Sequence, residues 1–496
     1  MIFDLIVKNG ILCTESLLKA DLGIKDGKII KIGDLSDFSF KDVIDAEGAI
    51  VTPGGIDAHV HLREPLDLFG EICDDFESGT RSAVAGGTTT IITFASQDPR
   101  EEGATALLNS INKCKDNCTR NLYCDYALHL IVFKIDKESL EKQLTLLAKE
   151  GKVTSIKLYM TYSKLQLKDY DLMTVLNVAR KCGITVMLHA ENGDMVQWMI
   201  DSLEEQGKTE PYYHAISRPS IFEGEATNRA IVMAETLDTP LLFVHVSAPE
   251  AIKVIQSAQS RGLRIFAETC PQYILLTSDN LKKLHSHDPF EGAKYICSPP
   301  PRQNEDDLEA IWSALGDGSV TIFSSDHCPT KYYTDDGKKI AFKNGHNGEF
   351  QWIPNGCPGV ETRLGLLASY GVSRERLSWE KFVELNCINP AKLYGMYPKK
   401  GTLIEGVSDA DIVIWYPQGK FQDQIKVENL HSNCDYTPFE GFEISNWPRY
   451  TIVKGQVVFK EGKFTLVDKR NGCFVPRNKS QLAVPRNRWI SEWRPC

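Results

Sequence analysis

Two histidines separated by a single residue, His59 and His61, end an apolar run within residues 51–65. Side chains at positions i and i+2 of a β-strand point to the same side, so both imidazoles can reach one metal ion. The same spacing also arises by chance, and the pair alone does not decide between a metal site and two structural histidines. Further ligands must come from elsewhere in the chain.

The segments that must position such a site are short apolar, β-branched runs, each followed by a longer stretch with helical periodicity. The eight runs are residues 50–62, 88–96, 126–133, 155–162, 184–191, 240–247, 263–273 and 320–329. Eight β–α units predict an α/β fold of the (β/α)8 TIM barrel type. An open doubly wound sheet is the alternative, but no glycine-rich phosphate loop follows the first strand.

The two ends of the chain have a different pattern. Residues 1–50 read as short strands between Asn-Gly and Asp-Gly turns, and strand patterns return after Gly401. We therefore predict one β-sandwich domain built from residues 1–52 and 401–470, with the barrel, residues 53–400, inserted between them. The irregular tail, residues 471–496, is predicted to be an arm that reaches a neighbouring subunit.

Side chains that could bind a metal stand where the predicted barrel strands end, which is where such barrels carry their chemistry. They are His59 and His61 on the first strand, Lys157 on the fourth, His189 on the fifth, His245 on the sixth and Asp326 on the eighth. Each histidine alone has an ordinary structural explanation. Four of them with an aspartate on one face of a barrel predict a shared metal centre.

The other histidines are predicted to lie outside this centre. We expect His129, in the middle of a strand, to be a core residue with its hydrogen bonds satisfied, and His327 to face away from Asp326. The remaining five are expected to make surface or loop contacts: His214, His285, His287, His346 and His431.

Lys157 leaves two alternatives open. A buried ammonium is disfavoured by desolvation and by nearby cations, so the side chain either extends to solvent or pairs with a carboxylate. Alternatively, its neutral amine captures CO₂ and becomes a carbamate. A carbamate is an anion with two oxygens that can bridge two metal ions, and nearby cations favour it.

Histidine and oxygen ligands without thiolates suit Zn²⁺, although Mn²⁺ and Co²⁺ also fit. Two such ions can hold a hydroxide that attacks a carbonyl carbon. Asp326 is suited to ligate a metal, accept the proton of this nucleophile and pass it to a leaving nitrogen. Tyr162 lies just beyond the fourth strand, where its phenol either stabilises a developing oxyanion or is simply an aromatic residue of the rim.

Composition excludes other classes of function. The chain has 496 residues, 42% of them hydrophobic and 25% charged, with a formal net charge of −10, which argues against a nucleic-acid-binding surface. No apolar run is long enough to cross a bilayer, and the start MIFDLIVKNG is not a secretory signal. The 14 cysteines are scattered, as expected for reduced thiols. We expect a cytoplasmic protein that binds neither nucleic acid nor membrane.

Several motifs in the same order resemble one family. HVH, SIKLYMTY, LHAENGDM, VHVSAPEA, AETCPQY, YICSPP, SSDHCP and IPNGCPGVETR together resemble the cyclic amidohydrolases of the dihydropyrimidinase and hydantoinase group, with the greatest likeness to yeast-type dihydropyrimidinases. The resemblance extends over nearly the whole chain, including NWPRYTIVKG and the final EWRP.

The resemblance implies a site and a reaction. One zinc ion would be held by His59, His61 and Asp326 and the other by His189 and His245, with a carboxylated Lys157 and a hydroxide between them. Tyr162 would stabilise the oxyanion, and Ser298 and Asn355 would contact the amide and imide groups of the substrate ring. The implied reaction opens dihydrouracil or dihydrothymine to an N-carbamoyl-β-amino acid, in pyrimidine catabolism. The family is usually tetrameric, which implies a homotetramer.

One departure concerns the substrate. After HVH the chain reads LREP, and an arginine at this place, Arg63, is the pattern of dihydroorotases, where it holds the carboxylate of the substrate. Alternatively, Arg63 pairs with Glu64, Glu71 or another acid, which we favour because Tyr162 and the IPNG segment fit dihydropyrimidinases. An apolar lid of Leu66, Leu68 and Phe69 is expected to follow. Dihydroorotase, allantoinase and broad hydantoinase activities remain the alternatives.

A function of another class is a non-enzymatic scaffold of the collapsin-response mediator type, which resembles dihydropyrimidinases but has lost metal ligands. All six ligand positions are present here, which argues against it.

Overall fold

The computed structural model describes residues 2–63, 72–103, 105–118, 121–282, 288–465 and 472–487. Eight parallel strands form the barrel, in sequential order around it. They are β6 (Gly55–Val60), β7 (Thr88–Ser96), β8 (Asp125–Ile131), β9 (Ser155–Tyr159), β10 (Thr185–His189), β11 (Leu241–Phe243), β12 (Ile265–Thr269) and β13 (Ile322–Phe323). The predicted barrel is confirmed.

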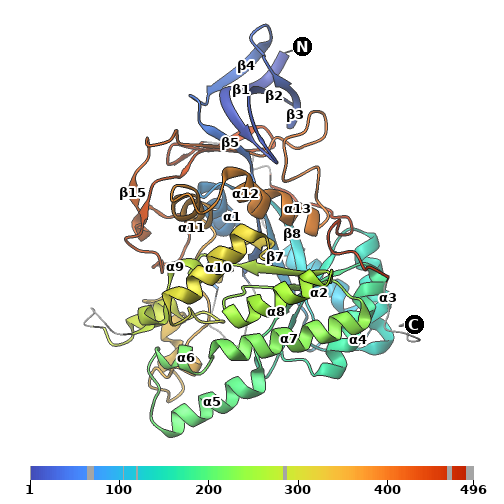
Figure 1. Ribbon diagram of the computed structural model, residues 1–496, viewed down its shortest axis with the longest axis vertical. Coiled ribbons are helices and arrows are strands. Elements are labelled where there is room, and N and C mark those ends of the chain that lie inside the picture. Colours follow the sequence, from blue (N-terminus) through green and yellow to red (C-terminus); the bar gives the residue numbers. More distant parts are fainter. Residues whose placement is uncertain are drawn as a thin grey trace.

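Helices follow the strands and cover the outside of the barrel (Figure 1). They are α1 (Phe76–Ala85), α2 (Ala106–Asp116), α3 (Lys137–Lys149), α4 (Asp169–Cys182), α5 (Gly193–Glu205), α6 (Tyr213–Ile216), α7 (Ser220–Leu237), α8 (Pro249–Ser260), α9 (Gln272–Leu275), α10 (Glu305–Asp317), α11 (Thr362–Leu367), α12 (Trp379–Val383) and α13 (Asn389–Leu393). Because helices cover their outer face, strands such as β8 and β10 are buried along their whole length.

The barrel closes between its first and last strands at two levels. At the carboxyl end of the strands, the N–H of His61 donates to the carbonyl oxygen of His327 over 2.7 Å. His61 lies just after β6 and His327 just after β13. Deeper in the barrel, the fully buried Arg363 on α11 lies between three strands. Its guanidinium is 3.2 Å from Asp57 on β6, 3.1 Å from the Thr88 hydroxyl on β7 and 2.6 Å from the Phe323 carbonyl on β13. One side chain therefore ties the ends of the barrel sheet together.

Strands from both chain ends form a nine-stranded sheet beside the barrel (Figure 1). Its strands are β1 (Ile2–Cys13), β2 (Leu17–Lys25), β3 (Lys28–Gly33), β4 (Ser39–Asp45), β5 (Ile50–Pro53), β14 (Ile412–Trp415), β17 (Pro448–Val453), β18 (Gln456–Lys460) and β19 (Lys463–Phe464). The two halves meet where β5 pairs with β14. A separate pair consists of β15 (Asp423–Gln424) and β16 (Glu443–Ile444). The boundaries proposed for the domains stay a prediction.

A buried charge cluster joins this sheet to the barrel. The Lys400 ammonium lies 2.6 Å from Asp125 at the start of β8, 2.6 Å from Asp411 beside β14 and 3.1 Å from Asp409. Desolvation by burial lowers the pKa of Lys400, but the three carboxylates raise it above its ordinary value. The lysine therefore remains charged and neutralises an acidic group that would otherwise resemble a cation site.

The described part of the tail lies along the chain's own barrel. Val475 donates a backbone hydrogen bond to Tyr126, and Arg477 donates one to Gly151. The remainder of the predicted arm, residue 471 and residues 488–496, lies outside the described residues. Among the described residues, no helix has the length and apolar composition needed to span a bilayer.

Candidate active site

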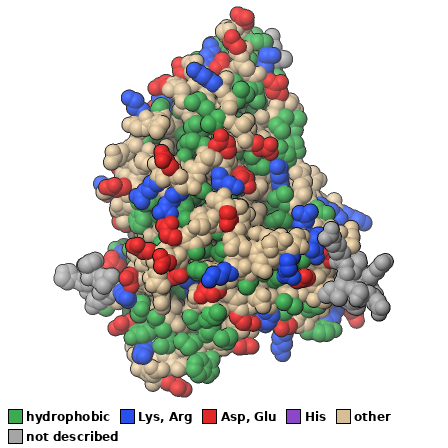
Figure 2. Space-filling model, viewed as in Figure 1, with side chains coloured by type: hydrophobic (Ala, Val, Ile, Leu, Met, Phe, Trp, Pro, Cys, Tyr) green, Lys and Arg blue, Asp and Glu red, His purple; other side chains and the backbone are tan. Residues whose placement is uncertain are grey.

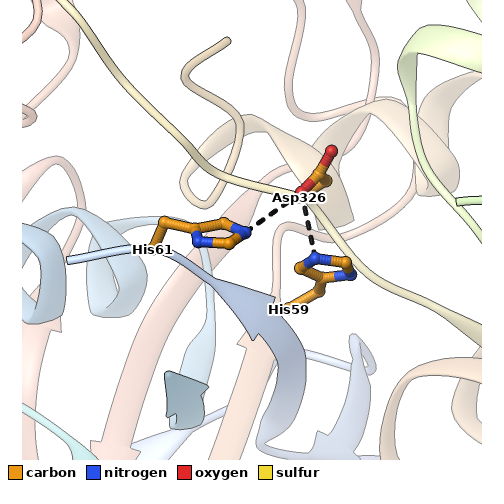
Figure 3. Close-up of side chains that lie close together, drawn as sticks. All are labelled: His59, His61 and Asp326. Atoms are coloured by element: carbon orange, nitrogen blue, oxygen red, sulfur yellow. Dashed lines mark ion pairs between the residues drawn. The ribbon is translucent and has the colours of Figure 1, made fainter. Parts of the chain in front are cut away.

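The first predicted ligands meet at the carboxyl end of the barrel. The Nε2 atom of His59 lies 3.1 Å from Oδ1 of Asp326, and Nε2 of His61 lies 3.5 Å from the same oxygen (Figure 3). Strand alternation explains the geometry, because His59 and His61 lie on one side of the chain at i and i+2. The first and eighth strands are neighbours in the closed barrel, which brings Asp326 to them.

Lys157, on β9, completes this corner of the site. Its side chain is 1% exposed, and its Nζ atom lies 3.3 Å from Nε2 of His59. The alternative in which this lysine extends to solvent is therefore wrong. The amine instead lies among the predicted ligands.

His189 and His245 lie beside this group. Their ring centroids are 4.4 Å apart, and the His245 ring lies 5.6 Å from the His59 ring. The Nδ1 atom of His245 is buried and has no hydrogen-bond partner among the described residues. The structure thus brings all six predicted ligand residues together, although their roles as ligands stay a prediction.

Three further predicted residues share the same cavity, which has a volume of about 60 Å³. Asn355 donates from Nδ2 to the Tyr162 hydroxyl over 3.3 Å, and Oγ of Ser298 lies 3.3 Å from Nε2 of His214. Burial raises the pKa of Tyr162 to about 12, partly offset by Arg218, so the phenol remains a hydrogen-bond donor at neutral pH. Tyr162 therefore lies beside the ligand cluster and not merely on the rim.

The protonation states suit a metal centre. Burial, with a contribution from Lys157, lowers the pKa of His59 well below its ordinary value, and burial and His189 do the same for His245. Burial alone would raise the pKa of Asp326, but His59 and His61 bring it below the ordinary value. The site thus combines neutral imidazoles with an ionised carboxylate and contains the unpartnered Nδ1 atom of His245. This donor set fits Zn²⁺ or a similar divalent ion.

Several site residues have an unusual backbone conformation. Tyr162, His245 and Asp326 all have positive φ values, of 64°, 41° and 50°. Residues other than glycine adopt this region at a cost, and such residues concentrate at functional sites. These residues lie just after the ends of their strands, where the unusual backbone conformation changes the direction of the chain.

Comparison with known sequences identifies the family of the chain. The profile described as "Amidohydrolase family" matches residues 50–458, which include every strand of the barrel. The chain belongs to the amidohydrolase family.

Relatives resemble this amidohydrolase over nearly its full length. A D-hydantoinase of Ralstonia pickettii is 39% identical over 96% of this chain and 99% of its own. A crystal structure of a dihydropyrimidinase from Brevibacillus agri NCHU1002 matches with a TM-score of 0.87 and 36% identity, over 96% of this chain and 99% of that one. An L-hydantoinase (dihydropyrimidinase) from Arthrobacter aurescens matches with a TM-score of 0.82 and 30% identity, over 96% and 100%.

Arg63 of this amidohydrolase is exposed and does not line the cavity of the ligand cluster. Among the described residues it lines a second cavity of about 410 Å³, and it is not one of the side chains lining the first. Phe94 separates the two, because it stacks on His61 at 4.5 Å and also lines the second cavity. The proposed partners Glu64 and Glu71 and the predicted lid, Leu66, Leu68 and Phe69, lie outside the described residues.

Sequence reasoning missed two buried acids of the amidohydrolase site. Oε1 of Glu268 on β12 lies 2.6 Å from Nδ1 of His59, and Oε2 of Glu191 lies 2.7 Å from Nε2 of His189. Burial raises the pKa of Glu268, whereas Arg218, 2.8 Å away, and His189 bring the pKa of Glu191 to about 2 against the effect of burial. The sequence contained a signal for both acids, because each lies in a run predicted to be a buried strand, and a glutamate is seldom fully buried without a partner.

The predictions for the other histidines had mixed outcomes. His129 is a satisfied core residue, with its ring nitrogens 2.5 Å from the Ser155 hydroxyl and 2.9 Å from the Ala58 carbonyl. His327 faces away and lies 3.0 Å from Asp74. His214 is 3% exposed and so makes no surface contact, but the expected loop contact is present, with its Nε2 atom 2.9 Å from the Cys297 carbonyl oxygen. His285 and His287 lie outside the described residues.

Proposed function

We propose that the protein hydrolyses cyclic amides, and that it opens six-membered dihydropyrimidines to N-carbamoyl-β-amino acids. The observation that supports this most strongly is the convergence of six side chains, from strands distant in sequence, on one buried cavity. Tyr162 and Asn355 lie in the same cavity and suit an amide substrate. The names of the relatives, D-hydantoinase and dihydropyrimidinase, are consistent with this chemistry.

The proposal includes two Zn²⁺ ions. His59, His61 and Asp326 would hold one ion and His189 and His245 the other, with Lys157 between them as a carbamate. When bound, such a pair of ions activates a water molecule for attack on a carbonyl carbon at neutral pH. Because all six positions are occupied by competent side chains, a non-enzymatic scaffold is disfavoured.

The chain's own residues would carry the remaining steps. Asp326 is ionised at neutral pH, so its carboxylate can accept a proton from the attacking water and return it to the leaving ring nitrogen. The neutral phenol of Tyr162 would donate a hydrogen bond to the carbonyl oxygen as negative charge develops there. Ser298 and Asn355 would orient the ring through its amide and imide groups.

Dihydrouracil and dihydrothymine are the substrates we favour, which would place the protein in pyrimidine catabolism. Hydantoins are the principal alternative, since several relatives bear that name. A dihydroorotase needs a cation at the substrate's carboxylate, and Arg63 lies in a different cavity from the predicted ligands. An allantoinase activity has no observation in its favour here.

A substrate panel on metal-quantified protein tests the proposal. Dihydrouracil, dihydrothymine, hydantoin, dihydroorotate and allantoin would be compared before and after removal of metal by a chelator. We expect ring opening of dihydrouracil, its loss with the metal and its return when Zn²⁺ and bicarbonate are supplied. Protein that binds no metal and stays inactive after this treatment would disprove the proposal.

Arg63 provides the test of substrate class. Arg63→Ala should leave dihydrouracil turnover within about threefold, because the side chain lies outside the site's cavity. If dihydroorotate is cleaved by the native protein, and this activity disappears in the variant, the dihydroorotase alternative holds instead.

We also propose a cytoplasmic homotetramer. Large apolar side chains are exposed on neighbouring helices, with Trp198 on α5 68% exposed and Ile221 and Val232 on α7 each 55% exposed. Apolar side chains gather at the lower left of Figure 2, in the region of these helices. Exposed groups of this kind are typical of subunit interfaces.

A further inference from the structure

Glu268 is a charged residue in the interior of the barrel, with no exposed surface. Two donors and one ring nitrogen surround its carboxylate. Nδ1 of His59 lies 2.6 Å from Oε1, the backbone N–H of His245 donates to Oε1 over 3.3 Å, and the Ser324 hydroxyl donates to Oε2 over 2.9 Å. This arrangement suits an ionised carboxylate, which only accepts hydrogen bonds.

The contact with His59 determines which ring nitrogen carries the proton. A neutral imidazole has one N–H and one lone pair, and an accepting carboxylate at Nδ1 places the N–H there. The lone pair is then left on Nε2. That nitrogen is the one directed into the site, 3.1 Å from Asp326 and 3.3 Å from Lys157.

We propose that Glu268 is a positioning residue that holds His59 in the tautomer and orientation required for metal binding through Nε2. The inference rests on the proposed metal centre and deepens it, because it assigns a role to a side chain on β12, one of the three barrel strands on which no ligand was expected. Outer carboxylates of this kind orient a ligand imidazole and increase its basicity.

The same arrangement occurs at the second proposed metal position with the opposite nitrogen. Glu191 contacts Nε2 of His189, which leaves Nδ1 for the site, and Arg218 donates to the same Glu191 oxygen over 2.8 Å. Each half of the site therefore has one buried acid that selects the ligating nitrogen of one histidine. This repetition is difficult to explain if Glu268 only stabilises the barrel.

A double-mutant cycle on Zn²⁺ affinity tests the inference in the full-length protein. The variants are Glu268→Gln, His59→Asn and the double variant, with Zn²⁺ affinity measured by competition with a chromophoric chelator. We expect Glu268→Gln to weaken the binding of one of the two ions about 10- to 100-fold. The double variant should bind no more weakly than His59→Asn, because Glu268 acts through His59.

The outcomes separate this inference from the function on which it rests. If His59→Asn binds Zn²⁺ as the native protein does, the proposed metal centre fails. If His59→Asn weakens binding but Glu268→Gln does not, only the role of Glu268 fails. Losses that add in the double variant would indicate a general structural role and would also overturn the inference.

A measurement on the native protein does not depend on how the variants fold. The metal-free protein would be labelled with ¹⁵N-histidine, and the His59 signals assigned by their absence in His59→Asn. We expect chemical shifts of the Nδ1–H tautomer for His59. Shifts of the Nε2–H tautomer would mean that Glu268 carries the proton and donates it, and would overturn the inference.

Discussion

Lys157 shows how the surroundings of a single residue determine its chemistry. On a strand this lysine resembles many that extend their ammonium to solvent, but here its amine is enclosed and lies 3.3 Å from His59. Aromatic rings flank it, with the centres of Phe94 and Tyr159 within 5.5 Å of Nζ. A charged ammonium between two metal ions would be unfavourable, whereas a carbamate would be stabilised.

Lys157→Met should remove the proposed bridge while preserving the volume of the side chain. We expect turnover of dihydrouracil to fall at least about 100-fold, the upper size of the effect when even an outer-shell partner of a metal site is lost. Steady-state kinetics and the zinc content of the variant measure the effect. Near-normal turnover in a variant with full zinc content would exclude the carbamate.

Tyr162→Phe removes only a hydroxyl group. Because the phenol is proposed to act on the developing oxyanion, kcat should fall about 100-fold with little change in KM. The zinc content should equal that of the native protein. A rise in KM at unchanged kcat would show instead that Tyr162 merely binds the substrate.

The ionisation of Tyr162 gives a separate pH prediction. Its pKa is raised to about 12, so the donor form is retained as the pH rises through the ordinary range for tyrosine. Absorbance at 295 nm should therefore show no difference between native protein and Tyr162→Phe below about pH 11. A difference that develops near pH 10 would mean that the phenol ionises as an ordinary tyrosine.

At the scale of secondary-structure elements, the closure of the barrel determines where the site lies. His59 and Asp326 are far apart in the sequence, and they meet only because β6 and β13 are neighbours in the closed barrel. Arg363 supports this closure from within by contacting β6, β7 and β13. Loss of the Arg363 contacts should therefore both destabilise the fold and displace the predicted ligands.

Arg363→Met should be strongly destabilising, because it leaves the fully buried Asp57 carboxylate without its cation. We expect a loss of about 3–5 kcal/mol in the free energy of unfolding, measured by urea denaturation. The matched control is Arg376→Met, which breaks an exposed pair with Glu309 and should cost no more than about 1 kcal/mol. Equal losses in the two variants would contradict the proposed role of Arg363.

At the scale of the whole molecule, the nine-stranded sheet and the exposed helices lie at opposite ends. Strands β1–β4 stand at the top of Figure 1, whereas α5 and α7 lie towards the bottom. The large apolar groups on α5 and α7 have no covering segment among the described residues. If the protein is a tetramer, these helices are the surface on which subunits should meet.

Trp198→Glu should therefore change the assembly. A charge at a buried interface position is unfavourable, so sedimentation velocity should show a shift from tetramer to smaller species. The control is Leu18→Glu on β2, which changes an exposed apolar residue of the nine-stranded sheet and should leave the mass unchanged. A tetramer in both variants would place the interface elsewhere.

Patterns that are local in the chain could be predicted from the sequence. Apolar runs that recur with helical stretches between them identified the barrel. Alternation along strands identified the common side of His59 and His61 and predicted that His327 turns away from Asp326. The strand-end rule placed His189 and His245 in the same site. The domain boundaries and the ligand roles stay predictions, because neither follows from residue spacing alone.

Contacts between distant segments were decided only by the tertiary structure. The amino-acid sequence alone determined the kind of fold and a set of candidate ligands, because strand periodicity and residue type are local properties. That Glu268 contacts His59, that Lys157 is enclosed and that Arg63 faces a separate cavity depend on strand register, closure of the barrel and the loop backbone. These properties arise from packing between strands far apart in the chain, with 209 residues between the positions of His59 and Glu268, which residue spacing does not encode.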